Sequence, residues 1–329
     1  MVTRRDFGKT LLAGMPAALA FARVNSTVRG VRLGASTYSF RDMISMPIEQ
    51  RIPAVIQALV ECQAGVTELF SPTIEPVGAM PQMARPPQRL TSETGPPPDA
   101  KAMQERMRAR MNSPEAKKAR ADLRDWRLST PMDYFRNVRK KFDDAGIDIY
   151  CYTVNYRDDF TDEEIGKTFE QCKAMHVGII ATSTQVSMMP RLLPFAEKHN
   201  IVVAFHGHSN TRDPNEFSSP ETFQKAWQTS KLFKTNLDIG HFAAANYDAV
   251  EFIRQYHEHI THLHMKDRKR NDGPNVPFGE GDTPIREVLL LLKEKQYPIP
   301  ALVEYEYRGT GTPVEETKKC MEYMRRVLA

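Results

Sequence analysis

Short apolar runs rich in β-branched residues alternate along most of the chain with longer stretches of helical periodicity. The short runs each end in polar residues and fall at positions 31–40, 66–71, 147–156, 178–183, 201–208, 235–241, 260–266 and 301–307. Between them, as at 52–60 and 285–292, apolar residues recur every three or four positions, which is typical of amphipathic helices. The pattern predicts a chain of eight strand–helix units.

Repeated strand–helix units predict a closed (βα)8 TIM barrel, an α/β fold whose active site forms at the carboxyl ends of the strands. The length of 329 residues suits one such barrel, and we expect residues 23–329 to form this single domain. A doubly wound open sheet is the alternative. The stretch Gly34-Ala-Ser-Thr in the first expected strand does not supply the GxGxxG turn that would favour that sheet.

The interval between the second and third expected strands is much longer than the others, so we expect an insertion at 72–128. Its first part, 72–98, is rich in proline, which excludes a long helix or a central strand. Its second part, 100–125, is rich in Lys, Arg, Met and Ala and predicts one or two solvated helices. Thr130-Pro131 then begins the helix that leads to the third strand. Because the insertion leaves from the carboxyl end of a strand, we expect a lid over the active site, an arm that contacts a second subunit in a homodimer, or a plain linker.

Composition and charge narrow the classes of function. Hydrophobic residues make up 41% and charged residues 26%, which allows a large core and argues against disorder. The net charge of +4 is a small difference between 45 basic and 41 acidic residues, so no nucleic-acid partner is expected. The cysteines lie far apart without a CxxC pair, and we expect them to be mostly core thiols: Cys62, Cys151, Cys172 and Cys320.

The N-terminus has the features of an export signal. Residues 3–9 contain the pair Arg4-Arg5, and a largely apolar run with small residues follows at 11–22. This run is shorter than the about 20 residues that span a bilayer. The segment resembles a bacterial twin-arginine signal. We therefore expect the twin-arginine translocase to export the folded chain to the periplasm and residues 1–22 to be removed.

Polar and charged residues gather at the ends of the last four expected strands. Alternate residues of a strand share a face, so several of these side chains would project into the barrel together. The groups are His206 with His208, His262 with His264 and Lys266, and Glu304 with Glu306, while the sixth strand contributes Asp238 and His241. Unpartnered charges inside a barrel would cost on the order of several kcal/mol each. A divalent metal ion is the partner that imidazoles and carboxylates can share, so the pattern favours a metal site over separate, satisfied core residues.

The sequence resembles the xylose-isomerase-like barrels, a family that includes sugar-phosphate isomerases, ketose 3-epimerases, inosose dehydratases and endonuclease IV. The resemblance covers most of residues 31–326. It rests on Ser-Thr-Tyr-Ser-Phe-Arg at 36–41, Glu68, Asp-x-Gly-His at 238–241, His-x-His-x-Lys-Asp at 262–267, Gly-Glu-Gly at 279–281, and Glu304. It implies a divalent ion held by Asp238, His264 and Glu304. His206 stands where the family usually has a glutamate.

This set of ligands narrows the choice of metal ion. Two carboxylates with one or two imidazoles suit Mn²⁺, Co²⁺, Zn²⁺ or Fe²⁺, whereas an all-oxygen set would favour Mg²⁺ or Ca²⁺. Either His206 or His208 supplies the ligand from the fifth strand. The catalytic base is expected to be Glu304 or His206, since an imidazole has a suitable pKa. His241 resembles the family's substrate-facing histidine.

The remaining candidates are expected to bind substrate. Tyr38, Arg41 and Lys266 would bind hydroxyls or balance charge, with a salt bridge between Lys266 and Asp267 as the alternative. His208 would also contact substrate if it is not a ligand. Glu68 would bind substrate or pair with an arginine.

Three functions from different classes compete. The first is a sugar isomerase or epimerase, in which the ion polarises the carbonyl of a ketose or keto-sugar and stabilises an enediolate. The second is a lyase or dehydratase that acts on a keto-glycoside or an oxidised sugar by β-elimination, which export and the histidine at 206 favour. The third is a sugar-binding protein without catalysis, which requires no metal. The DNA chemistry of endonuclease IV does not fit the charge balance or the expected location.

Overall fold

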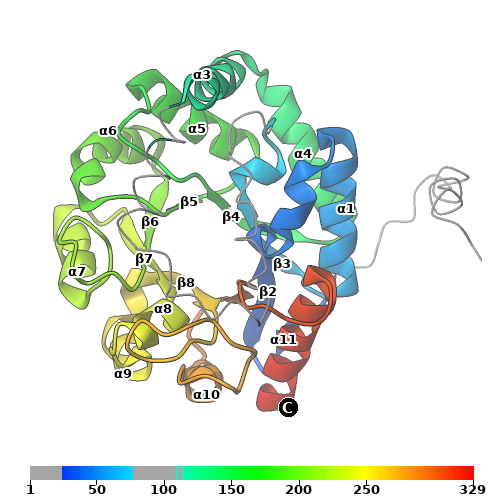
Figure 1. Cartoon of the computed structure of the whole chain (residues 1–329), viewed down its shortest axis with the longest axis vertical. Coiled ribbons are helices and arrows are strands. Elements are labelled where there is room, and N and C mark those ends of the chain that lie inside the picture. Colours follow the sequence, from blue (N-terminus) through cyan, green and yellow to red (C-terminus); the bar gives the residue numbers. More distant parts are fainter. Residues whose placement is uncertain (1–23, 77–108, 110–112) are drawn as a thin grey trace, which may run out of the picture.

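Parallel strands form a closed barrel in the computed structural model, which describes residues 24–76, 109 and 113–329 (Figure 1). Each strand pairs with the next along the chain, and β2 (Val31–Ser36) also pairs in parallel with β9 (Ala301–Val303), which closes the ring. The strands between these two are β3 (Val66–Phe70), β4 (Asp148–Thr153), β5 (Ile179–Thr182), β6 (Val202–His206), β7 (Phe233–Asp238) and β8 (Ile260–Met265). A short strand, β1 (Thr27–Val28), pairs antiparallel with β2. The predicted TIM barrel is confirmed.

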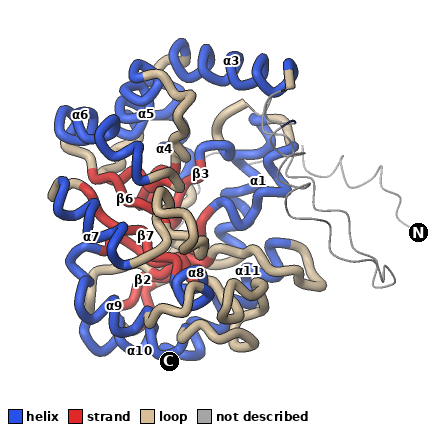
Figure 2. The backbone as a smooth tube through the Cα atoms, turned by 60° about the vertical axis from the view of Figure 1, so that its left-hand side comes forward, coloured by secondary structure: helices blue, strands red, loops and turns tan. Residues whose placement is uncertain are grey.

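Helices surround the ring of strands on its outside (Figures 1 and 2). The α-helices are α1 (Ile48–Glu61), α3 (Pro114–Ser129), α4 (Met132–Asp144), α5 (Asp162–Ala174), α6 (Met189–His199), α7 (Pro220–Thr229), α8 (Ile239–Ala244), α9 (Ala249–Tyr256), α10 (Ile285–Lys295) and α11 (Pro313–Leu328). Short 3₁₀ helices are η1 (Thr37–Ser45), η2 (Ser71–Thr73), η3 (Val186–Met188) and η4 (His257–His259).

The spacing of apolar residues explains why the outer helices pack as they do. In α4 the buried residues are Phe135, Val138 and Phe142, which recur at three and four positions and so form one face toward the strands. The same helix begins after Pro131, as predicted from the sequence. In α11 a capping box joins Thr312 and Glu315, which satisfies backbone donors at the first turn of the helix.

Several strands end earlier than the sequence predicted. The sixth strand of the barrel, β7, ends at Asp238, because the Asp238 side chain accepts a hydrogen bond from the backbone N–H of His241 and caps the short helix α8. His241 therefore comes from a helix and not from a strand. Likewise β2 ends at Ser36, so that Tyr38 and Arg41 lie in the 3₁₀ helix η1. Both strands therefore end at the carboxyl rim of the barrel, where the candidate ligands lie.

The insertion is only partly separate from the barrel. Its first residues, 72–75, which include the end of η2, are buried, and its last part forms α3, which contacts α5. A helix was expected within 100–125, and α3 overlaps this range and extends to Ser129. The expected lid, arm or linker falls on 77–108 and 110–112, which lie outside the described residues.

A buried cluster of charges joins the two described ends of the insertion. Arg127 on α3 donates two hydrogen bonds of 2.7 Å to the carboxylate of Glu75, and a third, of 2.9 Å, to Glu164 on α5. Arg120 completes the cluster through two bonds of 2.7 Å to Glu164. Since Glu75, Arg127 and Glu164 are all buried, each charge is stable there only because its partners are in place.

Acid is expected to destabilise the fold in part through Glu164. Burial alone would raise its pKa, but the hydrogen bonds and charges of Arg120 and Arg127 lower the pKa below its usual value. Its stabilising effect is therefore complete above the unfolded-state pKa of about 4.3 and is lost as the pH falls through the lower folded-state pKa. The free energy of unfolding, measured by urea denaturation between pH 6 and 3, should fall more steeply in the wild type than in Glu164→Gln. Equal slopes would contradict this assignment.

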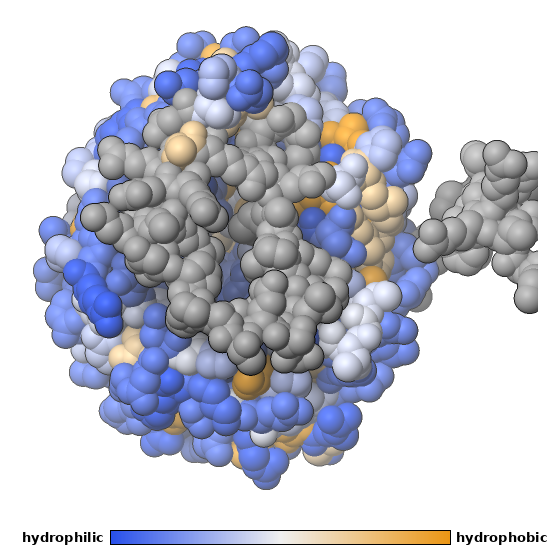
Figure 3. Space-filling view, in the orientation of Figure 1, coloured by the Kyte–Doolittle hydropathy of each residue, from blue (hydrophilic) through white to orange (hydrophobic). Residues whose placement is uncertain are grey.

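The described residues also show the character of the outer surface and the state of the cysteines. The face seen in Figure 3 is mostly hydrophilic where residues are described. All four cysteines are buried and free, as expected for core thiols. Over the part of the chain that the structure describes, no helix combines the length and apolar character that crossing a membrane requires. The expected export signal, residues 1–22, lies outside this part.

Candidate metal centre

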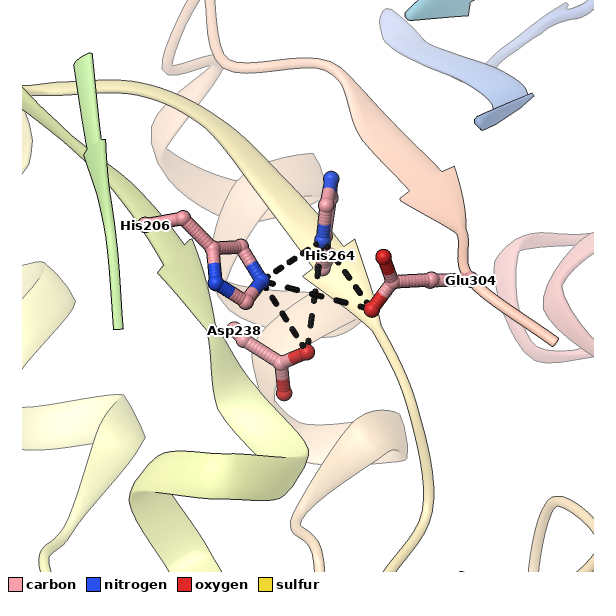
Figure 4. Close-up of side chains that lie close together, drawn as sticks. All are labelled: His206, Asp238, His264 and Glu304. Atoms are coloured by element: carbon pink, nitrogen blue, oxygen red, sulfur yellow. Dashed lines mark hydrogen bonds and ion pairs between the residues drawn. The ribbon is translucent and has the colours of Figure 1, made fainter. Parts of the chain in front are cut away.

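Four side chains from neighbouring strands converge at the carboxyl end of the barrel (Figure 4). His206, Asp238 and His264 lie at the ends of β6, β7 and β8, and Glu304 directly follows β9. One ligand atom from each residue lies within 4.8 Å of the corresponding atoms of the other three, and all four residues are buried. The structure thus brings together the four residues that the sequence analysis selected as metal ligands.

The geometry of this cluster is set by strand register and side-chain alternation. Asp238 pairs directly with His264 in the parallel ladder between β7 and β8, so both side chains reach the same height in the barrel. His206 Nε2 lies 3.0 Å from His264 Nδ1 and 3.6 Å from Asp238 Oδ2. His264 Nδ1 lies 3.3 Å from Glu304 Oε2. Two nitrogen and two oxygen atoms therefore face one point.

These four atoms fit a divalent cation. Asp238 Oδ2 is buried and faces the cluster, and its charge is balanced on one side by the Lys266 ammonium at 3.0 Å. The ring nitrogens of His206 and His264 point at each other, an arrangement in which two neutral rings can share at most one proton. A cation at this point would satisfy the carboxylate oxygen and both ring nitrogens at once. The donor set suits Mn²⁺, Co²⁺, Zn²⁺ or Fe²⁺.

The charge state of three of the four residues already suits metal binding. Burial alone would raise the pKa of Asp238 and Glu304, but the Lys266 ammonium and the neighbouring histidines hold both values well below their usual range. Burial lowers the pKa of His206, so its ring is neutral. His264 differs: burial would lower its pKa, but the carboxylates of Glu68 and Glu304 raise it. A metal ion would therefore displace a proton from His264.

Lys266 is the cation closest to the cluster. Its ammonium lies 2.6 Å from Glu304 Oε2, 3.0 Å from Asp238 Oδ2 and 2.6 Å from Glu306. The expected alternative, a salt bridge with Asp267, is wrong. Asp267 instead accepts backbone hydrogen bonds from Gly279, Gly281 and Thr283, so that it organises the following loop.

The Gly-Glu-Gly segment at 279–281 has a structural explanation in that loop. Gly279 has a φ of +91°, which disfavours any residue with a side chain. A Cβ on Gly281 would lie 1.8 Å from Asp267 Oδ1, so only glycine allows the backbone to approach this carboxylate. These glycines hold the loop after β8 through their contacts with Asp267.

His241 lies between two cations beside the cluster. Its Nε2 is 3.2 Å from Lys266 Nζ, and Arg268 donates a hydrogen bond of 2.7 Å to its Nδ1. Burial and the charge of Lys266 lower the pKa of His241 well below its usual value, so the ring is neutral. Arg268, which the sequence analysis did not select, is therefore the residue that orients His241.

The other expected substrate-binding residues lie at the barrel mouth or near it. His208 pairs with Glu216 at 3.1 Å and is half-buried, and its ring packs against that of His206. It is thus a neighbour of the cluster and not one of its four members. Arg41 donates a 2.6 Å hydrogen bond to the carbonyl oxygen of Tyr305 and stacks on the ring of Tyr38.

Glu68 lies deeper, in the lumen of the barrel. Its Oε2 is 2.7 Å from His264 Nε2 and 2.8 Å from His262 Nε2, and Ser36 donates a hydrogen bond to Oε1. The expected pairing of Glu68 with an arginine is wrong, since its partners are histidines. No local pattern could have indicated this, because β3 and β8 lie far apart in the sequence. Glu306 was also left without a role, although its alternation with Glu304 was visible.

Comparison with known proteins agrees with this architecture. Residues 115–327 match the model of a family described as "Xylose isomerase-like TIM barrel". L-ribulose-5-phosphate 3-epimerase UlaE of Salmonella paratyphi C is 30% identical over 97 residues, which is 30% of this chain and 34% of the relative. The match thus spans about a third of the length of that curated relative.

Two solved structures illustrate the likeness of fold. The IOLI protein, whose crystal structure contains a zinc atom, is 12% identical, with a TM-score of 0.57 over 91% of this chain and 98% of that chain. The 3-keto-D-glucoside 4-epimerase YcjR of E. coli is 10% identical, with a TM-score of 0.56 over 90% of this chain and 99% of that chain. At these identities the comparison concerns the fold alone.

Proposed function

The chain belongs to the xylose isomerase-like TIM-barrel family, and from this we propose that it is an exported, metal-dependent sugar isomerase or epimerase. It would move a proton next to the carbonyl of a ketose or keto-sugar. The observation that carries the proposal is the buried cluster of His206, Asp238, His264 and Glu304 at the carboxyl ends of the strands, where TIM-barrel active sites form.

A divalent ion bound there would polarise a substrate carbonyl and make the adjacent C–H more acidic. The base would be Glu304 or His206. His206 is neutral and Glu304 is ionised, so each is able to accept a proton. Lys266 would hold the carboxylates of Glu304 and Glu306 in place and offset their charge.

Groups around the cluster would bind and orient the sugar. Glu306 is more exposed than Glu304 and pairs with Lys266, so it would lie on the side from which substrate enters and could accept a hydrogen bond from a sugar hydroxyl. His241, Tyr38, Arg41 and His208 would contact hydroxyl groups. The epimerases among the similar proteins support a carbohydrate substrate, although they leave its identity open.

The test is to assay the purified chain after loading with Mn²⁺, Co²⁺, Zn²⁺ or Fe²⁺. Incubation in D₂O with a ketose, and separately with a 3-keto-glycoside, should incorporate deuterium next to the carbonyl and give an isomer or epimer. Deuterium incorporation should be absent in the metal-free protein. A chain that binds sugar with no metal and no exchange would contradict the proposal and support a non-catalytic sugar-binding role.

A lyase acting on a keto-glycoside or an oxidised sugar is the second candidate. It is favoured by His206, because a neutral imidazole replaces one of the two carboxylates that a symmetrical proton transfer on both faces of a sugar would use. The same D₂O incubation separates the two activities. A lyase would release the substituent and form an unsaturated product, whereas an isomerase or epimerase would keep every heavy atom of the substrate in one product.

Export by the twin-arginine route is part of the proposal, with the periplasm as the location. It makes one prediction about stability: a chain lacking residues 1–22 should fold, bind metal and unfold at the same temperature as the exported, processed protein. The reason is that the barrel begins with β2 at Val31. Loss of folding on this truncation, measured by circular dichroism, would contradict the assignment of these residues as a signal.

A further inference from the structure

The His264 ring has polar partners on both of its nitrogen atoms, and they lie in different parts of the barrel. Nδ1 faces the candidate metal centre, 3.0 Å from His206 Nε2 and 3.3 Å from Glu304 Oε2. Nε2 faces the lumen, 2.7 Å from Glu68 Oε2. The ring therefore connects the candidate metal centre to a carboxylate that the proposed chemistry does not use.

When the His264 ring is neutral, its contact with Glu68 decides which nitrogen carries the proton. The Asn236 amide nitrogen also lies 3.1 Å from Nε2, but the amide oxygen has no hydrogen-bond partner, so the amide can be turned to accept a hydrogen bond from Nε2–H. A neutral imidazole has one N–H and one lone pair. If Nε2 carried the lone pair, it would face the carboxylate oxygen of Glu68 at 2.7 Å, and the two would repel each other. With the proton on Nε2, the ring donates to Glu68, and the lone pair of Nδ1 points at the other three ligand candidates. This is the tautomer that a metal ligand requires.

Glu68 reaches His264 from the far side of the lumen. It lies on β3, whereas His264 lies on β8, and in the closed ring β2 and β9 separate these strands on the shorter path. Both residues are almost wholly buried. Water therefore cannot replace the hydrogen bond between them, and its loss would leave a polar group without a partner.

We infer that Glu68 is a positioning residue that fixes the tautomer and orientation of His264 and thereby sets the metal affinity of the proposed centre. The inference rests on the proposed function, because it concerns the same ion. It assigns Glu68 no contact with the ion or with substrate.

A second metal site around Glu68 is the competing explanation. Glu68, Cys151 and His262 place one ligand atom each close together and are all buried. However, the Glu68 carboxylate already accepts hydrogen bonds. Besides the two histidines, Ser36 donates to Oε1 at 3.2 Å and the Cys151 thiol donates to Oε2 at 3.7 Å. A carboxylate with this many donors has little capacity left for a cation, so these contacts favour a hydrogen-bonded anchor.

The test compares Co²⁺ binding by the wild type, Glu68→Gln and Cys151→Ser. The glutamine keeps the shape of the side chain but loses the charge, so we expect Co²⁺ affinity to fall by about 10–100-fold, the usual effect of losing such a partner. Cys151→Ser is the matched control, because Cys151 contacts Glu68 and His262. It should leave the affinity nearly unchanged. Every protein should bind one Co²⁺ per chain.

A measurement on the unaltered chain keeps the inference testable if Glu68→Gln does not fold. In the zinc-loaded wild type labelled with ¹⁵N-histidine, long-range ¹H–¹⁵N spectra should show His264 protonated at Nε2 and bound at Nδ1. The opposite tautomer would overturn the inference, as would two Co²⁺ per chain with a thiolate absorption band that Cys151→Ser removes. Equal Co²⁺ affinity in the wild type and Glu68→Gln would overturn the inference but leave the proposed function standing. A wild type that binds no Co²⁺ would also defeat the proposed function.

Discussion

Replacing Asp238 or Glu304 with alanine is expected to remove metal binding and activity together. Both carboxylates are ionised in the buried cluster, and each points one oxygen at the two histidine nitrogens. Loss of a direct ligand should weaken the affinity by more than the about 10–100-fold that loss of an outer partner costs. Metal content after dialysis against a chelator, and deuterium exchange into a ketose, are the measurements.

Glu306→Gln is the matched control for this experiment. Glu306 lies two residues after Glu304 and contacts the same lysine, but it is not one of the four ligand candidates. It should therefore retain the ion, even if turnover falls. Full metal occupancy in both Asp238→Ala and Glu304→Ala would show that the ligand assignment is wrong.

The barrel and the gathering of polar residues at its carboxyl rim were predictable because they depend on short-range periodicity, whereas the choice of the four ligands came from the resemblance to the family. Alternating strand and helix patterns give the order of elements, and parallel strands of a barrel place their carboxyl ends on one rim. Polar residues at four successive strand ends must then meet. This is why Asp238 and His264, which are 26 positions apart, could be placed together before the register that pairs them was known.

The contacts that cross the barrel or join distant segments could not be predicted in this way. Glu68 and His264 meet through the lumen, and nothing in the sequence around Glu68 distinguishes a histidine partner from an arginine partner. The choice of Lys266 between Asp267 and the ligand carboxylates depends on where β8 ends, which periodicity locates only to within a few residues. The partners of Arg127, Glu75 and Glu164, could not be predicted either, because they lie on segments far from it in the sequence.

Arg127 is the residue whose removal should destabilise the fold most strongly among those discussed. Its side chain is 6% exposed and holds Glu75, which is 2% exposed, through two parallel hydrogen bonds of 2.7 Å. If Arg127 is removed, Glu164 still forms an ion pair with Arg120, whereas Glu75 loses its ion pair. Removing one partner of a buried pair typically costs about 3–5 kcal/mol, mostly because the other charge remains buried.

Arg127→Met should therefore lower the free energy of unfolding by about 3–5 kcal/mol, measured by urea denaturation at pH 7. Arg120→Met should lower the free energy of unfolding by less, because Arg120 is partly exposed and its partner Glu164 still forms an ion pair with Arg127. Adding Glu75→Gln to Arg127→Met should recover part of the loss, since the buried charge that Arg127 compensated is then absent. If the double variant is less stable than Arg127→Met alone, the cost of the single change comes from lost packing against Phe160 and not from the uncompensated carboxylate.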